Sequence, residues 1–215
     1  AYQETLPKEQ RSENVMDSLK KFPLLLHDRY FLGHCLLQCF VFGAFFSYLS
    51  GSSFVFQNIY GVSPQGFSMI FAVIGTGLLL AGILPARLAG RVPDIVMLKY
   101  AVLVPLIGSS LLLIGFVVSA PLPVIFMLLF ITIIPLSVMG AASFSLALSR
   151  QGKNAGSASA LIGCFSMLLG ACMMPIVGIA GDHTAIPMGV IMLTCYGLGV
   201  FVFYRMIASA HLAMR

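Results

Sequence analysis

The chain has 215 residues, of which 59% are hydrophobic and 9% are charged, and its mean hydropathy is +1.00. This composition excludes an ordinary soluble globular domain and indicates an integral membrane protein. The net charge of +5 could belong to a nucleic-acid-binding surface or to the loops of a membrane protein, and the positions of the cations distinguish the two.

The first 29 residues are the only long polar stretch, and their charges are mixed. The cations are Lys8, Arg11, Lys20, Lys21 and Arg29, and the acids are Glu4, Glu9, Glu13, Asp17 and Asp28. Behind Ser12, which can serve as an N-cap, hydrophobic residues recur at helical spacing: Val15, Met16, Leu19 and Phe22. This pattern predicts that residues 1–29 are a cytoplasmic linker with a short amphipathic helix, which lies on the membrane face or against the bundle.

Residues 30–86 contain no Lys, Arg, Asp or Glu. One helix crosses the hydrocarbon core with about 20 residues, so this run is too long for a single crossing. Its middle, residues 56–64, reads FQNIYGVSP, which is rich in turn formers and carries no cation. We therefore predict a helical hairpin with spans at 30–56 and 65–86.

Two more hairpins follow along the chain. Residues 100–149 carry no formal charge and are broken by SAPLP at 119–123, and residues 155–204 are broken by AGDHT at 180–184. These breaks predict four further spans, at 95–118, 122–148, 155–179 and 186–207, and a short cytoplasmic tail at 208–215. The predicted fold class is an all-α integral membrane bundle of six transmembrane helices over residues 30–207.

The 12 Lys and Arg residues are distributed unevenly. All of them fall in the N-terminal stretch, in the two loops between hairpins or at the C-terminal end, and none falls in the three hairpin turns. In membrane proteins the cytoplasmic loops carry the excess of Lys and Arg. We therefore expect both termini to be cytoplasmic, the hairpin turns to face outward, and no nucleic-acid partner.

Neither an enzyme nor a metal site is indicated. No set of nucleophile, base and orienting group recurs at one depth, and no phosphate-binding loop points to ATP. The five Cys residues all lie in apolar runs, where a reduced thiol acts as a small hydrophobe. His34, Cys35 and Cys39 are close on one predicted helix, but no fourth ligand is near them in sequence, so we expect neither a metal nor a cofactor.

Three segments resemble parts of one transporter family. Residues 1–6 (AYQETL) resemble the run that opens the central linker of major facilitator superfamily drug exporters. Residues 46–57, followed by 60–63, resemble their seventh helix and its outer end, and residues 155–163 resemble the start of the eleventh. Together they are similar to the Bcr/CflA group of drug:proton antiporters, which includes bicyclomycin resistance proteins. The resemblance implies helices seven to twelve, the C-terminal half of the major facilitator fold.

The same resemblance implies a function and a location. The chain would be half of a secondary active multidrug efflux transporter, working by proton-coupled alternating access in the bacterial inner (plasma) membrane. Its partners would be a small lipophilic drug, protons, the lipid bilayer, and an N-terminal six-helix half or a second copy of this chain. Two alternatives stay open: an exporter of a metabolite or peptide on the same fold, and a six-helix membrane subunit without transport activity alone.

The resemblance places the first and fourth spans along a central cavity. On the first span, six residues at three- and four-residue steps share a face and are predicted to line the cavity: Gln38, Phe42, Phe46, Ser50, Ser53 and Gln57. Phe130 on the fourth span and Met167 on the fifth are further candidates. Aromatic surface with a few amides and hydroxyls suits a lipophilic drug. The alternative is that the Phe side chains face lipid or neighbouring helices.

A proton-driven exporter needs a membrane-embedded group that binds and releases a proton, usually a carboxylate. No Asp or Glu lies in the interior of any predicted span. His34, about one turn inside the cytoplasmic end of the first span, is therefore the candidate for proton coupling in this chain. The alternative is a neutral buried histidine, because the embedded acid of the resembling family is typically on the N-terminal half.

Overall fold

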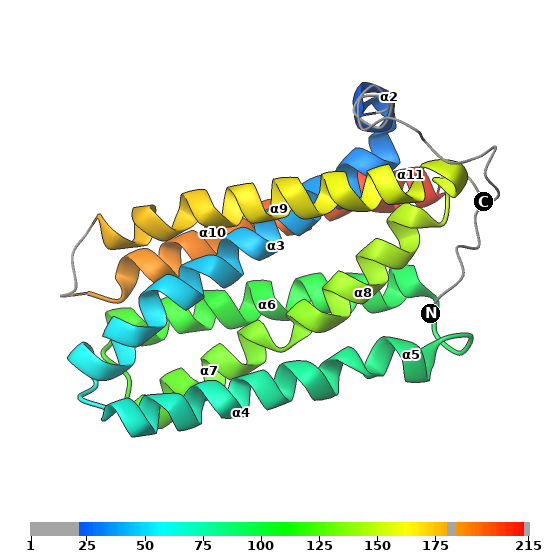
Figure 1. Ribbon diagram of the computed structural model, residues 1–215. Coiled ribbons are helices and arrows are strands. Elements are labelled where there is room, and N and C mark those ends of the chain that lie inside the picture. The colour runs from blue at the N-terminus through cyan, green and yellow to red at the C-terminus, as the bar shows by residue number, and fades with distance from the viewer. Residues whose placement is uncertain (1–21, 180–183, 213–215) are drawn as a thin grey trace, which may run out of the picture.

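The computed structural model describes residues 22–179 and 184–212 (Figure 1). Within these residues, six helices are long and apolar enough to cross a membrane: Arg29–Ile59, Pro64–Leu88, Asp94–Val117, Leu122–Leu148, Ala155–Gly178 and Ile186–Ala208. This confirms the all-α, six-span fold class. The amphipathic helix predicted from the pattern at 12–22 falls almost entirely outside the described residues, as does most of the third hairpin turn.

The spans are assembled from shorter helical elements. The helix α2 (Phe22–His27) precedes the first span. The first three spans are built from α3 (Arg29–Phe54), the π-helical η2 (Val55–Ile59), α4 (Pro64–Gly82), α5 (Leu84–Leu88) and α6 (Asp94–Val117). The last three are built from α7 (Leu122–Ile133), α8 (Pro135–Leu148), α9 (Ala155–Gly178), α10 (Ile186–Val202) and the π-helical η4 (Phe203–Ala208). The short η3 (Gly152–Asn154) joins the fourth span to the fifth, and α11 (Ser209–Leu212) follows the sixth.

Proline explains two of the internal breaks. α7 ends at Ile133 and α8 starts at Pro135, which has no backbone N–H with which to continue the helical hydrogen-bond ladder. Pro85 likewise lies in the first turn of α5, just after the break at Ile83, and it too lacks a backbone N–H. Pro105 and Pro175 lie inside α6 and α9 and end neither helix. The fourth span is therefore two helices that meet within the membrane.

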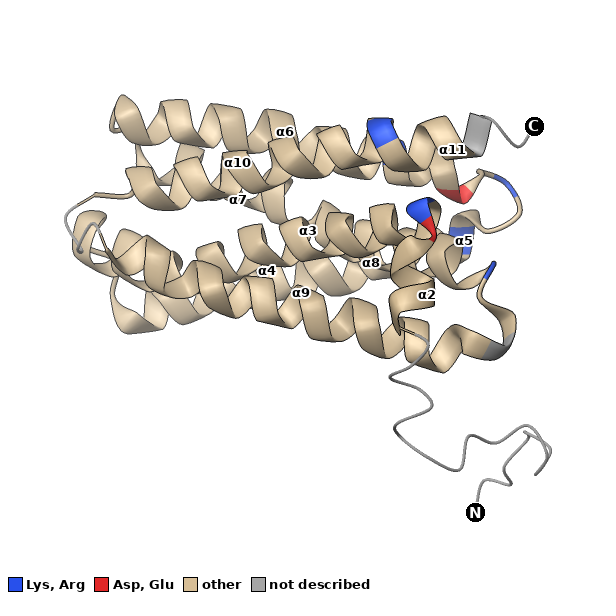
Figure 2. Cartoon of the chain, turned by 90° about the horizontal axis from the view of Figure 1, so that it is seen from above, with Lys and Arg blue, Asp and Glu red and all other residues tan. Residues whose placement is uncertain are grey.

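The spans lie side by side with α3 at the centre (Figure 1). α3 packs against α9, α10 and α8, while α4 lies on the opposite side of the bundle beside α7 and α8. The described Lys, Arg and Asp residues lie toward the end of the bundle that carries α2, α5 and α11 (Figure 2). The chain thus has one charged end and one end without charges among the described residues.

Two hydrophobic clusters hold the helices together. The larger one runs through the middle of the bundle, where Tyr48 of α3, Leu112 of α6 and Leu129 of α7 are fully buried. The smaller one lies at the charged end, where Leu25 anchors α2 beside Ala158 of α9. Because lipid tails are as apolar as leucine, shape complementarity between helices, more than exclusion of water, stabilises this packing.

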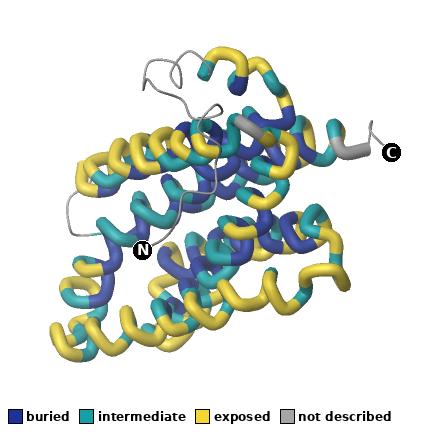
Figure 3. The backbone as a smooth tube through the Cα atoms, turned by 45° about the vertical axis from the view of Figure 1, so that its right-hand side comes forward, coloured by how far each residue is buried: buried dark blue, intermediate teal, exposed yellow. Residues whose placement is uncertain are grey.

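α4 and α9 are the spans with the least burial. In its most apolar stretch, α4 with α5 is 11% buried and α9 is 28% buried, whereas the first span is 56% buried. Figure 3 shows α4 along one edge of the bundle, with exposed and half-buried residues over most of its length, and Ile74 is its buried residue. These two spans therefore present the largest apolar faces that no other described helix covers.

A close contact between α3 and α9 gives a first prediction. A Cβ atom on Gly170 would lie 2.8 Å from Cδ2 and 3.0 Å from Cγ of Phe46. The ring is rigid near its base, so Gly170→Ala requires one helix to shift. We expect Gly170→Ala to lower the free energy of unfolding in detergent micelles by about 1–3 kcal/mol.

Gly163→Ala on the same helix is the matched control, because nothing lies within 4 Å of the added Cβ. We expect its unfolding free energy to change by less than about 0.5 kcal/mol. An equal loss in both variants would show that the α9 glycines matter for the helix itself and not for its packing on Phe46.

Candidate substrate and proton site

The start of α3 is fixed by Asp28. Its Oδ1 accepts hydrogen bonds from the backbone N–H groups of Tyr30 and Phe31, at 2.9 and 3.4 Å, which is the usual role of an aspartate N-cap. Its Oδ2 accepts a hydrogen bond from Nε2 of Gln151 at 3.3 Å. Since Gln151 lies between α8 and α9, Asp28 holds the first turn of α3 against both of these helices.

His34 lies one turn inside this end and is completely buried. Its Nδ1 is 2.9 Å from Oγ of Ser143 on α8, and the ring of Tyr30 meets its ring edge-on at a centroid distance of 4.7 Å. Its Nε2 has no hydrogen-bond partner among the described residues. His34 therefore joins α3 to α8 through one ring nitrogen and leaves the other unpaired in the interior.

A cation lies at the outer end of this group. Cζ of Arg150 is 3.9 Å from the centroid of the Tyr30 ring, a cation–π contact. Tyr30 in turn contacts His34, which contacts Ser143. A continuous row of polar and aromatic side chains thus leads from the charged end of the bundle into the membrane-spanning part.

Unpaired buried polar atoms gather on α3. Among the described residues, three buried side-chain atoms have no hydrogen-bond partner, and all three belong to this helix: His34 Nε2, Gln38 Oε1 and the Tyr48 hydroxyl. Gln38 follows His34 by four residues and so shares its face, and the Tyr48 ring stacks on Phe71 of α4 with centroids 5.9 Å apart. Unpaired buried polar atoms are rare in folded proteins, and each costs about 1–3 kcal/mol.

The outer half of the predicted cavity face is more open. Phe42 is half-buried, with its ring centroid 6.3 Å from that of Phe46. Ser53 is exposed, and its Oγ accepts a hydrogen bond from Nε2 of Gln57 at 2.9 Å. This part of the first span offers an aromatic surface with a hydroxyl and an amide beside it.

Phe46 and Ser50 lie in the contact between α3 and α9. Phe46 packs on Gly170, and Oγ of Ser50 donates a hydrogen bond to the main-chain carbonyl of Met174 at 3.2 Å. The six residues predicted to share one face are therefore divided. Gln38 is buried, Phe42 and Gln57 are half-buried, Ser53 is exposed, and Phe46 and Ser50 contact α9.

Comparison with known proteins identifies the family. The chain is 38% identical over 202 residues to the uncharacterized MFS-type transporter YdgK of Bacillus subtilis (strain 168), a match that covers 94% of this chain and 50% of that protein. It is 29% identical over 191 residues to the bicyclomycin resistance protein homolog of Haemophilus influenzae (strain ATCC 51907 / DSM 11121 / KW20 / Rd), covering 86% of this chain and 46% of that protein. The chain belongs to the major facilitator superfamily. No family model and no solved structure matches it.

The chain spans about half the length of the curated relatives it matches. Six transmembrane helices are one half of the major facilitator fold, so the span count and the coverage agree. Members of this superfamily are transporters, so the chain is not an enzyme. The described residues contain no group of three or more His, Cys, Asp or Glu side chains that could hold a metal ion.

The structure does not gather all the predicted cavity residues of this major facilitator half at one place. Phe130 of α7 is half-buried against Gly77 of α4, beside Phe126. With residues of α4 it lines an apolar hollow of about 340 Å³. Met167 is 53% exposed on α9. Phe130 and Met167 thus lie on different surfaces of the bundle from His34 and Gln38.

Tyr30 and Tyr48 of α3 were not predicted from the sequence as site residues. Tyr30 precedes His34 by four residues, so helical spacing alone could have placed it on the same face. Tyr48 acquires its position by stacking on α4, which depends on how the first two spans pack and has no local signal. Arg150 was predicted only as a cytoplasmic loop cation, and its contact with Tyr30 is a tertiary one.

Proposed function

We propose that this chain forms helices seven to twelve, the C-terminal half, of a secondary active multidrug exporter that works by proton-coupled alternating access. The observation that carries the proposal is the concentration of unpaired buried polar atoms on α3, at His34, Gln38 and Tyr48. A helix that contacts only lipid and packed neighbours gains nothing from such atoms. A transport cavity provides them with partners in the form of substrate, protons and water.

The substrate class that we propose is a small lipophilic drug. The H. influenzae relative is named for bicyclomycin resistance, and the first span presents chemistry that suits such a ligand. The Phe42 ring supplies apolar contact, while Gln38 and the Ser53–Gln57 pair supply hydrogen-bonding groups. We place four further residues at the edges of the cavity, with secondary roles in binding: Phe46, Ser50, Phe130 and Met167.

His34 is our proposed proton-coupling group within this half. In the tautomer that donates from Nδ1 to Ser143, Nε2 is an acceptor and is the atom that takes up a proton. Protonation would place a second cation close to Tyr30, whose ring already faces Arg150. Because like charges at short range repel each other, protonation would favour a rearrangement of α3 relative to α8.

The exposed faces of α4 and α9 are the proposed contact with the other six-helix half. A Cβ atom added to Gly75 of α4, or to Gly156 or Gly163 of α9, would meet nothing within 4 Å. Small residues with open space above them let the backbone of a partner helix approach closely. A second copy of this chain is the alternative partner for the same faces.

The proposed location is the bacterial inner membrane with both termini cytoplasmic, and cysteine labelling tests the orientation. In a variant whose native Cys residues are replaced, single Cys residues at Asn58, Pro121 and Thr184 should react with an impermeant maleimide applied to intact cells. Single Cys residues at Gly90 and Asn154 should react only after lysis, because the positive-inside rule puts the charged end in the cytoplasm. Labelling of the second set in intact cells would reverse the orientation.

The test of the function is a fusion of the first half of the H. influenzae relative to this chain. In cells that lack their own exporters, we expect the fusion to lower bicyclomycin accumulation, and a protonophore to abolish the effect. The same fusion with His34→Ala should still bind drug but should release no protons when drug is added. Export that survives the protonophore would contradict proton coupling, and a membrane-inserted fusion that binds no drug would contradict the substrate class.

A further inference from the structure

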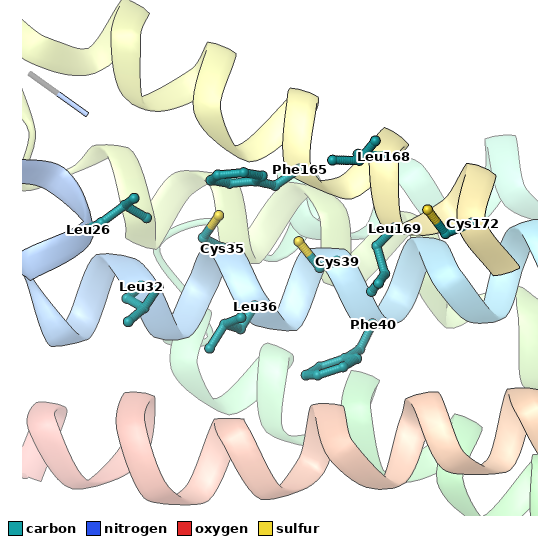
Figure 4. Close-up of a pocket in the computed structure, with 10 residues that line it drawn as sticks. All are labelled: Leu26, Leu32, Cys35, Leu36, Cys39, Phe40, Phe165, Leu168, Leu169 and Cys172. Atoms are coloured by element: carbon teal, nitrogen blue, oxygen red, sulfur yellow. The ribbon is translucent and has the colours of Figure 1, made fainter. Parts of the chain in front are cut away.

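An apolar groove runs along α3 and α9. Its residues Phe165 and Leu168 lie about 140–200° around α9 from Gly163, the side that the proposed function places against the other half. Its volume is about 480 Å³, and its walls include Leu32, Leu36 and Phe40 of α3 and Phe165 and Leu168 of α9 (Figure 4). Leu26 of α2 closes it at the charged end of the bundle. The lining is apolar apart from thiols, so a hydrocarbon chain is the ligand to which it is complementary.

The groove is distinct from the proposed transport cavity. Leu36 follows His34 by two residues, which turns it about 200° around the helix from that side chain. His34 contacts α8, so the groove opens on the opposite side of α3. A ligand in the groove would not contact the unpaired atoms of His34 and Gln38.

The depth of the groove matches one leaflet of a bilayer. Phe40 lies eleven residues along α3 from Arg29, the first residue of the helix, which corresponds to about 16 Å. The hydrocarbon core of a bilayer is about 30 Å thick, so the groove extends from one membrane surface to near the midplane. An acyl chain of a lipid in the same leaflet covers this depth.

Two exposed arginines lie at the charged end of the bundle, in a pocket separate from the groove. Arg29 and Arg205 line one pocket together with Ser209, and the Arg29 guanidinium donates a hydrogen bond to the main-chain carbonyl of Arg205 at 3.5 Å. Arg29 precedes Leu32 and Leu36 by three and seven residues, so it continues the same stripe of α3. The neighbouring Asp28 carboxylate is engaged by the Tyr30 and Phe31 amides and by Gln151.

We propose that the arginine pocket and the groove together bind an anionic phospholipid, with its phosphate at Arg29 and Arg205 and an acyl chain along Leu32, Leu36 and Phe40. Guanidinium groups bind phosphate through paired hydrogen bonds, and basic pockets at the ends of transmembrane helices recognise anionic headgroups. A zwitterionic lipid supplies the same acyl chain, but its net charge is zero. The site should therefore distinguish phosphatidylglycerol from phosphatidylcholine.

The absence of tryptophan from the chain makes the test direct. Phe165→Trp puts the only tryptophan in the groove, and Ile107→Trp puts it on α6 at a position that is 60% exposed. Each protein is reconstituted in vesicles, and quenching by dibrominated phosphatidylglycerol is compared with quenching by dibrominated phosphatidylcholine. The ratio of the two within one protein removes differences in tryptophan depth.

We expect the F165W protein to prefer phosphatidylglycerol by about fivefold or more, and the I107W protein to show no preference. Adding Arg29→Ala and Arg205→Ala to F165W should abolish the preference, whereas Arg29→Lys with Arg205→Lys should retain most of it and shows that the fold tolerates changes there. Excess inorganic phosphate should leave the preference in place, because the acyl chain anchors the lipid.

Three results would overturn the proposal. Equal ratios in the F165W and I107W proteins would mean that the groove takes any lipid. A preference that persists without the arginines would move the headgroup site elsewhere. Loss of the preference in inorganic phosphate would indicate a site for free anions and not for a lipid.

Discussion

Replacing Gln38 with methionine should stabilise the bundle and weaken drug binding at the same time. Gln38 is 1% exposed, and its Oε1 has no hydrogen-bond partner among the described residues. Methionine has a similar length and no amide to leave unpaired. We expect the free energy of unfolding to rise by about 1–2 kcal/mol, because the desolvation penalty of the amide is removed.

If Gln38 faces substrate, the same change removes a hydrogen bond to the drug. We expect the Kd of the proposed fusion for its drug to rise about tenfold, which corresponds to about 1.4 kcal/mol. Equilibrium binding of labelled drug and unfolding in detergent micelles measure the two effects on the same preparation. Opposite signs for stability and binding are the signature of a polar group kept for function.

Gln57→Met is the matched control, since it makes the same chemical change on the same face of the first span. The amide of Gln57 already donates to Ser53 near the uncharged end of the bundle, so its removal should leave stability unchanged or slightly lower. If Gln38→Met instead destabilises the bundle, the Gln38 amide is paired in the folded protein and the cavity argument loses its main support.

The number and class of the spans could be predicted because the signals are local. A hydrocarbon core of about 30 Å requires long uncharged runs, and any turn between two spans must interrupt them. The break at 119–123 is an example, where Ser119 adopts a φ of +51° and the chain reverses between α6 and α7. The break between α7 and α8 at Pro135 follows from the missing N–H of proline.

The site was less predictable because it depends on which helix covers each part of α3. Helical spacing puts Ser50 and Ser53 on one broad face, but the structure turns Ser50 to the Met174 carbonyl and leaves Ser53 exposed. The pairing of His34 with Ser143 joins residues 109 positions apart. No periodicity in the sequence carries that information.

This chain by itself should not catalyse gradient-driven export. Alternating access requires two bundles that move against each other around one site, and this chain supplies one six-helix bundle. Purified and reconstituted in vesicles with an imposed pH gradient, it should move no ethidium-like dye above the leak of empty vesicles. It should also release no protons when drug is added.

Weak drug binding should survive in the isolated chain, because the wall formed by Gln38, Phe42 and the Ser53–Gln57 pair is present without its partner. The exposed faces of α4 and α9 should instead bind lipid, detergent or a second copy, and crosslinking through a Cys placed at Gly156 or Gly75 distinguishes these. If the chain carries out gradient-dependent export only as dimers that can be crosslinked, the second half of the transporter is another copy of this chain. The same export, if it were carried out by monomers and abolished by His34→Ala, would contradict the two-half mechanism and make His34 the proton carrier of a complete six-helix transporter.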